Sequence, residues 1–478
     1  MTSNLRMPEA DWKRLREHCQ TSFRPGNPPE TGALGLLGEC RVGQRQTFLL
    51  VKLMYPGPGD LSVATNGSLV FASSYIRRAH LAVREAGLAG LAFIHTHPRA
   101  TTRVGFSLYD DQQEPLLVEN LLELHPQTQI VSIVLGRDSQ CGRVWLDARH
   151  NKLLNELALV GEALRFLPLD GTPAPPPPVP EAIFDRGLPL TGAGALALLH
   201  RLTVVVAGAS GTGTLLCELL ARAGCRRILL IDFDIVTTIN LNRMLYATLQ
   251  DAKDRRRKTE VVRSAIEQSG LDCTVEPIHG SILDRRILSQ VRAADVIFGG
   301  LDRAFPRHFL SEFAYRYVLP YIDVGSEIGG DDRGIVSLDS RASYVAPGRP
   351  CLSCTGIVTP RQLHFESLSA VERQRHAQLG YSDDLLIEKP AVMDLNMPSA
   401  SKGVMLLRHL LQPFLLKPLP VTWSENLVTY TTLPIVKARL ADETCPTCRL
   451  NATAGYGDCA PALGLDPAAV AAIHGFDI

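Results

Sequence analysis

Two histidines and an aspartate in the first third of the sequence can hold a metal ion. His95 and His97 stand one residue apart at the end of an apolar run, and Asp110 follows after a short loop. Side chains at positions i and i+2 of a strand point the same way, so both imidazoles can reach one ion. Three such ligands suit zinc with a fourth position for water, which becomes a nucleophile near neutral pH. The alternative is a loop that carries two unrelated imidazoles.

Metal-assisted hydrolysis also needs a general base and a donor for the developing negative charge. Glu30, at the start of the first apolar run, is our candidate base, and Glu39 is its competitor. The hydroxyl of Ser107 can stabilise an oxyanion. These residues complete a candidate hydrolytic site.

A glycine-rich turn begins a second set of candidate residues. The apolar run 204–207 enters a turn that contains Gly208, Gly211 and Gly213, and a second apolar run ends at Asp232. Small residues let the backbone approach a phosphate, and the following helix offers free N–H groups at its positive end. Asp232 lies 24 residues after Gly208, close to the spacing expected of a ribose-binding carboxylate. We therefore predict half of a nucleotide-binding βαβ unit, although a serine stands where the middle glycine is usual.

Four cysteines form two pairs of equal spacing, Cys351 with Cys354 and Cys445 with Cys448. Four thiolates suit a closed, tetrahedral, structural zinc site. Redox chemistry at one pair is the alternative, but two matched pairs favour a metal. The chain has 11 cysteines, which in a cytoplasmic protein favours metal or thiol chemistry over disulfides.

The helices and strands that we expect around these residues indicate a mixed α/β protein. In the first half we expect an N-terminal helix, a hairpin of strands 31–38 and 46–54, helices 73–85 and 151–167, and strands 91–94 and 129–135. In the second half strands 228–232, 295–299 and 321–324 alternate with helices 214–223, 258–268 and 305–317. This alternation predicts a parallel sheet.

A proline-rich stretch suggests the domain boundary, because it favours an extended chain that packs as neither helix nor sheet. We predict a metal-binding domain in 1–167, a linker in 168–182, a nucleotide-binding domain in 183–450 and a loose tail with one short helix in 451–478.

Charge and hydropathy exclude several classes of function. The chain has 478 residues, with 49 lysines and arginines against 49 aspartates and glutamates. Zero net charge gives no reason to expect nucleic-acid or membrane binding. The start is charged, without the apolar core of a signal peptide, and no run of about 18 apolar residues predicts a transmembrane helix. We expect a cytoplasmic protein.

The first site resembles the motif of JAMM (JAB/MPN) metalloproteases. The residues that carry the resemblance are His95-Thr96-His97-Pro98, the later Ser107-x-x-Asp110 and an upstream glutamate. The loop between the two parts is about two residues longer than the family pattern. JAMM proteins are zinc isopeptidases that cut after the C-terminal glycine of ubiquitin-like proteins. The resemblance covers about residues 20–160. It implies an α/β fold with His95, His97 and Asp110 as zinc ligands, Ser107 as the oxyanion helper and Glu30 as the base.

The second site resembles ThiF/MoeB proteins and ubiquitin-activating enzymes. The string Asp232-Phe-Asp-Ile-Val-Thr-Thr-Ile-Asn240-Leu-Asn-Arg243 carries the resemblance, together with the paired cysteines. The resemblance implies a Rossmann-like adenylation domain with a structural zinc. Asp232 would hold the ribose of ATP, while Asn240 and Arg243 would approach the phosphates.

Three further residues have roles implied by this second resemblance. Lys258 matches a phosphate-binding lysine, with Lys253 as the alternative. Asp302 would bind Mg²⁺, or cap the following helix, or both. Arg186 matches an arginine that in homodimeric relatives reaches the partner's ATP site and stabilises departing pyrophosphate, and its alternative is a solvated surface charge.

The sequence departs from the family pattern at one position of chemical importance. Many relatives carry a thioester-forming cysteine between the two zinc knuckles, whereas this chain has none between Cys354 and Cys445. The chain can stop at the acyl-adenylate, pass the acyl group to a partner's thiol, or use a cysteine elsewhere, such as Cys459. Cys217 and Cys225 are expected to be packing residues.

Together the two resemblances imply a bifunctional enzyme of the kind found in bacterial ubiquitin-like operons, several of which act in phage defence. It would process or remove a ubiquitin-like protein and activate its C-terminal glycine with ATP and Mg²⁺, as a homodimer and with a conjugating enzyme as a possible partner. One alternative is sulfur-carrier activation for thiocarboxylate formation in cofactor biosynthesis. Another is a degenerate scaffold that only binds the modifier.

Overall fold

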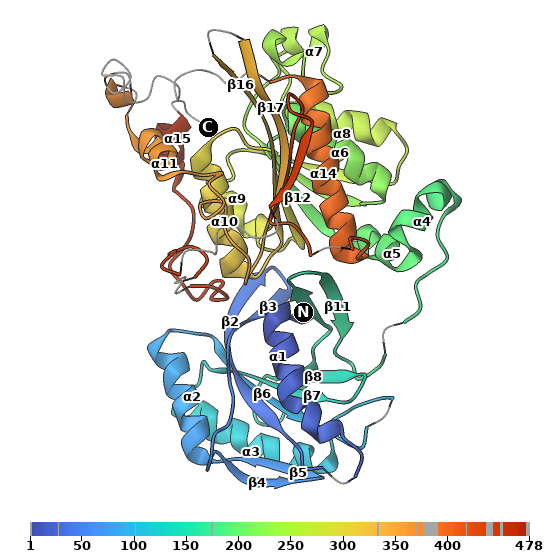
Figure 1. The fold of residues 1–478 in the computed structure, drawn as a ribbon. Helices are drawn as coiled ribbons and strands as arrows, with labels where there is room; N and C mark the ends of the chain where they lie inside the picture. Colours follow the sequence, from blue (N-terminus) through green and yellow to red (C-terminus); the bar gives the residue numbers. More distant parts are fainter. Residues whose placement is uncertain are drawn as a thin grey trace. The chain divides into compact units, whose positions relative to one another are not determined.

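The computed structural model contains two units, each built on one large mixed sheet (Figure 1). The first unit comprises residues 2–176 with two short returns of the chain, 316–318 and 453–462, and the second comprises the remainder. The structure describes residues 2–26, 28–100, 102–173, 175–331, 334–369, 371–373, 375, 391–416, 418–435, 443–449 and 453–474.

The first unit has a nine-stranded sheet in the order β11-β10-β1-β3-β2-β6-β7-β8-β9. Its strands are β1 (Thr2–Pro8), β2 (Gly32–Val42), β3 (Arg45–Met54), β6 (Gly90–Thr96), β7 (Gln129–Leu135), β8 (Gln140–Trp145), β9 (Asn151–Leu153), β10 (Glu156–Val160) and β11 (Leu164–Pro168). A separate hairpin is formed by β4 (Leu61–Thr65) and β5 (Ser68–Phe71). The helices are α1 (Glu9–Cys19), the 3₁₀ turn η1 (Gln20–Phe23), α2 (Ser73–Glu85) and α3 (Leu108–Leu124).

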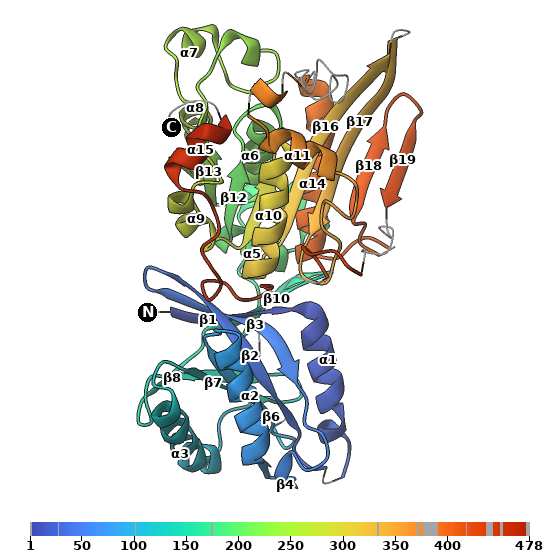
Figure 2. The ribbon, with the colours of Figure 1, turned by 90° about the vertical axis from the view of Figure 1, so that its left-hand side faces the viewer.

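Alternation along the strands decides which helix covers which face of this sheet. On β6, Ala92 and Ile94 belong to the core that contains α1, whereas Leu91 and Phe93 belong to the core beneath α2 and α3. The helices accordingly lie on opposite faces (Figure 2). Because side chains alternate with a period of two, His95 continues the face of Leu91 and Phe93, which α3 covers.

Most of the predicted elements of the first unit are confirmed, but one expectation is wrong and one strand was missed. Residues 151–167 form β9, β10 and β11 instead of a helix. The apolar run 157–160 is buried between β1 and β11, and a fully buried strand cannot be told from a buried helix by periodicity alone. The turn at Gly161 was the local signal. The N-terminal helix is present as α1, but the strand β1 before it was not foreseen because its Ser3, Asn4 and Arg6 are polar and yet buried.

The second unit has an eight-stranded sheet in the order β14-β13-β12-β15-β16-β17-β18-β19. The first five are parallel and the last three are antiparallel to their neighbours. The strands are β12 (Thr203–Ala207), β13 (Arg227–Asp232), β14 (Thr274–His279), β15 (Val296–Gly299), β16 (Tyr321–Asp331), β17 (Gly334–Val345), β18 (Thr422–Asn426) and β19 (Thr431–Ile435).

Helices cover both faces of the second sheet, with α6, α8 and α14 on one side and α9 and α10 on the other (Figure 1). The helices are α4 (Leu188–Thr191), α5 (Ala193–Arg201), α6 (Gly211–Ala223), α7 (Leu249–Lys253), α8 (Lys258–Gln268), α9 (Arg285–Val291), α10 (Ala304–Tyr317), α11 (Pro360–Ser367), α14 (Met393–Leu411) and α15 (Pro467–His474), with 3₁₀ turns η2 (Ala182–Gly187) and η3 (Thr238–Asn240). The predicted alternation of strands and helices is confirmed here, and it produces the parallel part of the sheet.

The segment 453–462 is packed within the first unit, whereas the sequence suggested a loose tail. The Asp458 N–H donates to the Glu39 carbonyl at 2.7 Å, and the Asp458 carboxylate accepts from the Arg41 N–H at 2.9 Å. The buried guanidinium of Arg316 donates to the carbonyls of Gly457 and Ala460. These contacts fix the segment along the end of β2.

Among the residues that the structure describes, no single helix is long and apolar enough to cross a membrane. Two consecutive helical segments, Ala182–Thr191 and Ala193–Arg201, are together long and apolar enough, but the chain bends by 113° between them.

Candidate functional site

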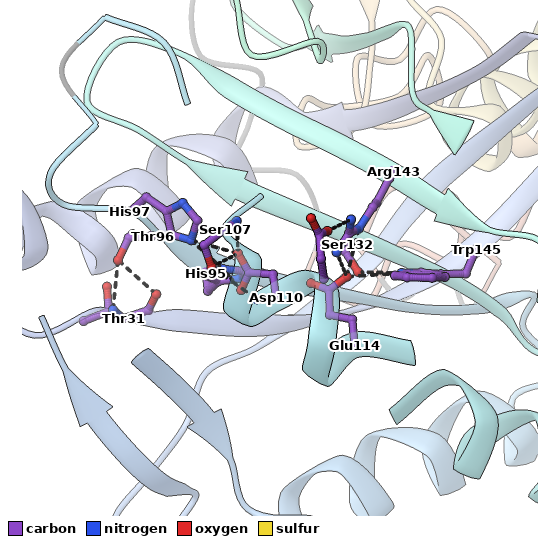
Figure 3. A network of polar contacts seen from close by, with 11 residues as sticks. Thr31, His95, Thr96, His97, Ser107, Asp110, Glu114, Ser132, Arg143 and Trp145 are labelled. Carbon is purple, nitrogen blue, oxygen red and sulfur yellow. Dashed lines mark hydrogen bonds and ion pairs between the residues drawn. The ribbon is translucent and has the colours of Figure 1, made fainter. Parts of the chain in front are cut away.

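His95, His97 and Asp110 meet where β6 ends and α3 begins (Figure 3). The two histidine Nε2 atoms lie 3.1 Å apart. His95 Nε2 lies 3.2 Å from Asp110 Oδ1, and His97 Nε2 lies 3.2 Å from Asp110 Oδ2. The backbone positions His97 because its N–H donates to the carbonyl of Leu135, which extends the pairing of β6 with β7. Two imidazoles and a carboxylate thus face one point.

The spacing of these atoms fits zinc. Two ligands of a tetrahedral ion are separated by about 1.6 bond lengths, so zinc bonds of about 2.0–2.1 Å place the ligand atoms about 3.3 Å apart. The observed separations of 3.1–3.2 Å are close to this value. The described part of the chain supplies three ligands at this point, which would leave a fourth position for water or substrate.

The charges in the cluster compensate one another. Burial alone would raise the pKa of Asp110, but hydrogen bonds and charge from His95 and His97 lower it well below its ordinary value. Burial alone would lower the pKa of His95, and Asp110 raises it above its ordinary value. Strong mutual perturbation of buried titratable groups is typical of functional sites.

Ser107 has a structural contact in addition to its predicted role. It is the N-cap of α3, and its hydroxyl donates to Asp110 Oδ2 at 2.8 Å while accepting from the Asp110 N–H at 3.2 Å. The Ser107 N–H also donates to Asp110 Oδ2, at 2.6 Å. This capping box holds the carboxylate in place. Use of Ser107 as an oxyanion donor stays a prediction.

Glu30 lies beside the cluster, and Glu39 does not. Glu30 is 5% exposed and interacts electrostatically with both histidines and Asp110. Burial raises its pKa against the opposing effect of the histidines. On β2, Gly32 pairs with His95. Glu39 lies seven residues beyond Gly32 on the same strand, which at strand spacing is about 23 Å from Gly32. The Glu39 carboxylate instead accepts from Arg41 and Gln46.

The glycine-rich turn packs too closely for side chains. Gly208 has φ +97°, and a Cβ there would lie 2.6 Å from the carbonyl oxygen of Gly300. A Cβ on Gly213 would lie 1.8 Å from the carbonyl oxygen of Gly208. The helix α6 starts at Gly211 without a side-chain cap from Ser210. Ser210 therefore leaves the first N–H groups of α6 uncapped, as an anion site at a helix start requires.

Asp232 is held at the end of β13 next to this turn. Its Oδ2 accepts from the Ala209 N–H at 2.6 Å, and its Oδ1 accepts from the Asp234 N–H at 2.8 Å. Burial raises the pKa of Asp232, and the charge of Lys258 opposes that effect. Lys258 is buried at the start of α8 and donates to Asp234 Oδ2 at 2.7 Å, whereas Lys253 is exposed on α7. Lys258 is thus the lysine that lies at this edge.

The segment with Asn240 and Arg243 packs directly on the turn. A Cβ on Gly211 would lie 3.3 Å from the carbonyl oxygen of Arg243. Asn240 is buried, and its Oδ1 accepts from the N–H and hydroxyl of Thr237, both at 3.0 Å. The Arg243 guanidinium is exposed and donates to the Ile239 carbonyl at 2.8 Å. Asn240 therefore shapes the loop, while the role of Arg243 at the phosphates stays a prediction.

Asp302 and Arg186 are exposed side chains. The first N–H groups of α10, from Ala304 and Phe305, donate to the carboxylate of Glu366 at 2.8 Å each. Glu366 thus fills the capping role considered for Asp302. Within the described ranges, neither Asp302 nor Arg186 has a hydrogen bond or an ion pair. Their predicted roles in metal binding and in a partner's site remain predictions.

A buried charged group at the same edge was not foreseen. Asp323 on β16 is fully buried and accepts from Arg341 at 2.6 Å and from the Tyr321 hydroxyl at 3.0 Å, while Arg307 Nε lies 3.5 Å away. Strand pairing places Gly299 between Ala207 and Asp323 in one row. Two guanidinium groups thus face the Asp323 carboxylate, and Glu327 also interacts electrostatically with Arg341. Arg307 follows Asp302 by five residues, which was the only local signal.

The four paired cysteines form the second metal cluster. Cys351 Sγ lies 3.7 Å from Cys445 Sγ, and Cys354 Sγ lies 3.5 Å from Cys448 Sγ. Zinc–sulfur bonds of about 2.3 Å predict about 3.8 Å between sulfurs of a tetrahedral site, so the cluster fits zinc. A hydrogen bond from the Cys448 thiol lowers the pKa of Cys351 below its ordinary value. A bound ion would join segments 94 residues apart.

The other candidate thiols are not activated. Burial raises the pKa of Cys459, of Cys217 and, to about 12, of Cys225. A reactive thiol requires a lowered pKa. Cys217 and Cys225 are fully buried packing residues, as predicted.

Comparison with known proteins identifies the second unit. Residues 184–420 match the ThiF family, so the second unit carries a ThiF-family domain with a Rossmann-like fold. The chain is 31% identical over 134 residues to tRNA threonylcarbamoyladenosine dehydratase 2 of Saccharomyces cerevisiae, covering 27% of this chain and 30% of that protein. It is 25% identical over 188 residues to the NEDD8-activating enzyme E1 catalytic subunit of Arabidopsis thaliana, covering 36% and 39%. Molybdopterin-synthase adenylyltransferase of Salmonella typhimurium is 28% identical over 140 residues, covering 29% and 54%.

These matches span about a third to a half of the relatives' own length. Among solved structures, E. coli MccB with ATP is similar at 18% identity and a TM-score of 0.44, covering 56% of this chain and 75% of that one.

Replacing Cys351 with serine should remove one zinc from the protein. We expect about two zinc ions per chain in the wild type and about one in Cys351→Ser, with a lower Tm because binding energy at a structural site is folding energy. Elemental analysis and thermal unfolding measure both. Cys217→Ala, a buried cysteine outside the cluster, should lower Tm and keep both ions. Two retained ions in Cys351→Ser would contradict the site.

Replacing Glu30 with glutamine should stabilise the protein once a mild chelator has emptied the His–Asp site. The raised pKa means that the folded state disfavours the ionised form, so the charge costs stability above the unfolded value near 4.5. The gain should be present at pH 7 and should vanish as pH falls below 4.5. Urea unfolding at both pH values measures it. Glu39→Gln should show no gain, and an equal gain there would refute the explanation.

Proposed function

We propose that this chain, whose residues 184–420 match the ThiF family, frees and then activates the C-terminal carboxylate of a ubiquitin-like protein. The first unit would be a zinc-dependent peptidase or isopeptidase. The second would be an ATP-dependent adenylyltransferase. Both reactions act on the same group, because hydrolysis after a terminal glycine produces the carboxylate that adenylation consumes.

One observation carries the adenylation half: the ThiF match covers a sheet edge where the glycine turn, Asp232 and Arg243 adjoin. The substrate carboxylate would attack the α-phosphorus of ATP, and the bond to the pyrophosphate oxygen would break. Asp232 would bind the ribose, and Arg243 and Lys258 would stabilise charge on the phosphates. Asp302, exposed at the same edge, suits Mg²⁺, which would neutralise the leaving pyrophosphate.

The hydrolytic half is supported by the geometry of the His–Asp cluster. His95, His97 and Asp110 would hold zinc, which when bound supplies an acidified water and polarises a carbonyl. Glu30 would accept the proton of that water and pass it to the leaving amine. Its buried position and raised pKa suit both steps. Ser107 would donate to the oxyanion when it is released from Asp110.

The fate of the adenylate distinguishes two candidate functions. No cysteine lies between the zinc knuckles, and burial raises the pKa of Cys459. This favours transfer of the acyl group to a thiol of a partner such as a conjugating enzyme. The same observation also suits sulfur-carrier activation, in which the product is a thiocarboxylate. The mass of the modifier after reaction with a sulfur donor separates the two.

We further propose a cytoplasmic homodimer encoded in a bacterial ubiquitin-like operon, with a role in phage defence. Reduced thiols are required for the four-cysteine zinc site, which suits the cytoplasm. Arg186 is exposed on η2, where it is accessible to a partner's nucleotide. A scaffold without catalysis is less favoured because both sets of candidate residues are intact.

Adenylation predicts ATP–pyrophosphate exchange that depends on a small ubiquitin-like protein ending in glycine. Arg243→Ala should lower the exchange rate by about 10²–10³-fold, the usual cost of losing one transition-state donor. Arg222→Ala, an exposed arginine on α6 paired with Glu218, should leave the rate unchanged. No exchange with any member of a panel of glycine-ended modifiers would refute the proposal.

Hydrolysis predicts chelator-sensitive cleavage of a modifier extended beyond its terminal glycine. Glu30→Gln should lower cleavage by about 10²–10⁴-fold because the proton acceptor is lost, with zinc content unchanged. Glu39→Gln is the matched control and should cleave normally. Cleavage that persists in Glu30→Gln, or that survives removal of zinc, would contradict the assignment.

A further inference from the structure

Arg143 is a buried cation close to the His–Asp cluster that none of the proposed chemistry uses. It lies on β8 and is 5% exposed. Its Nε and Nη2 donate to Glu114 Oε2 at 3.0 and 2.9 Å (Figure 3). Its Nη1 donates to Asp111 Oδ1 at 2.6 Å. Both acceptors lie on α3, the helix that carries Asp110. One side chain of the sheet therefore binds the ligand-bearing helix at two points.

Aromatic rings fix the guanidinium of Arg143. Its Cζ lies 3.8 Å from the ring centroid of Phe106 and 4.7 Å from that of Trp145. The Trp145 indole N–H donates to Glu114 Oε2 at 3.2 Å and to Ser132 Oγ at 3.1 Å. A planar guanidinium can stack and form several hydrogen bonds in one orientation, which lysine cannot do. We call Arg143, Phe106, Asp111, Glu114 and Trp145 the α3 clamp.

The clamp holds the chain on both sides of Asp110. Phe106 directly precedes the N-cap Ser107, while Asp111 and Glu114 lie within the turn that follows Asp110. Movement of either flank would change the capping box and the position of the carboxylate. Arg143 touches both flanks at once.

The periods of helix and strand bring clamp and metal ligands into register. On β7, Val134 pairs with His95 and Ser132 pairs with Arg143, so these partners are two residues apart on one face. Two strand residues span about 6.6 Å. Asp110 and Glu114 are one turn apart on α3 and span about 6 Å. The contact of Asp110 with His95 and the contact of Glu114 with Arg143 are therefore neighbouring contacts between α3 and the sheet, one helical turn apart.

From this geometry we propose that Arg143 is a positioning residue for the metal site, setting the place of Asp110 through α3. The proposal rests on the zinc site proposed above. It assigns Arg143 no contact with metal or substrate. A purely structural arginine would support the fold without affecting how tightly the cluster binds zinc.

Zinc affinity of the full chain tests this proposal. The second zinc is titrated against a chromophoric chelator while the four-cysteine site stays filled. We expect Arg143→Met to weaken this affinity by about 10–100-fold, the usual effect of residues that orient metal ligands. Arg143→Lys, which keeps the charge but loses the stacked fork, should give an intermediate loss. Glu114→Gln, a milder change, should also weaken binding and serves if Arg143→Met fails to fold.

Arg165→Met is the matched control. Arg165 binds the buried Glu9 in the same unit, away from the cluster, so this variant should lose stability and keep wild-type zinc affinity. The proposal is overturned if Arg143→Met binds zinc as tightly as the wild type. If Arg143→Met does not fold, wild-type zinc affinity of both Arg143→Lys and Glu114→Gln overturns it. A wild-type chain that binds no second zinc overturns the zinc site itself, and the clamp with it.

Discussion

Both units depend on one constraint: the backbone and side chains of a buried strand become accessible to a ligand at its last residues or just beyond them. Within a sheet, the N–H and C=O groups are paired and the side chains are packed. At the end of β6, pairing with β7 continues only to His97, and the two imidazoles emerge beside α3. At the ends of β12, β13 and β15, the turn at Gly208, the carboxylate of Asp232 and the segment before Asp302 emerge together. Parallel neighbours align these ends, so residues from several strands share one edge.

The helix that follows each strand completes the site by its first turn. Ser107 begins α3 and fixes Asp110 through a reciprocal cap. In the second unit, α6 begins at Gly211 with no side-chain cap from Ser210, as suits a phosphate-binding helix start. A filled cap suits a rigid metal ligand, and an open one suits an anionic substrate. The first turn of a helix can therefore fix a metal ligand or bind an anion, depending on whether the N-cap side chain bonds its N–H groups.

Local patterns in the sequence were sufficient to find these edges. His95, His97 and Asp110 lie within 16 residues, and Gly208 to Asp232 is one strand–helix–strand unit, so short-range spacing encodes them. The strands β1 and β10 escaped prediction because they pair with each other across about 150 residues, and β11 is the edge strand beside β10. Arg143 and Arg341 were missed because their partners lie on other elements of the fold. Each is an arginine in an otherwise ordinary strand, and only tertiary contacts with Glu114 or Asp323 reveal its role.

The carboxylate links the two units in the proposed account, because the first reaction must create what the second consumes. The most direct test uses a ubiquitin-like protein with extra residues after its terminal glycine and measures ATP–pyrophosphate exchange. The account predicts exchange with this precursor for the wild-type chain and none for Glu30→Gln, while the mature protein supports exchange by both. Exchange of the uncut precursor by Glu30→Gln would contradict it.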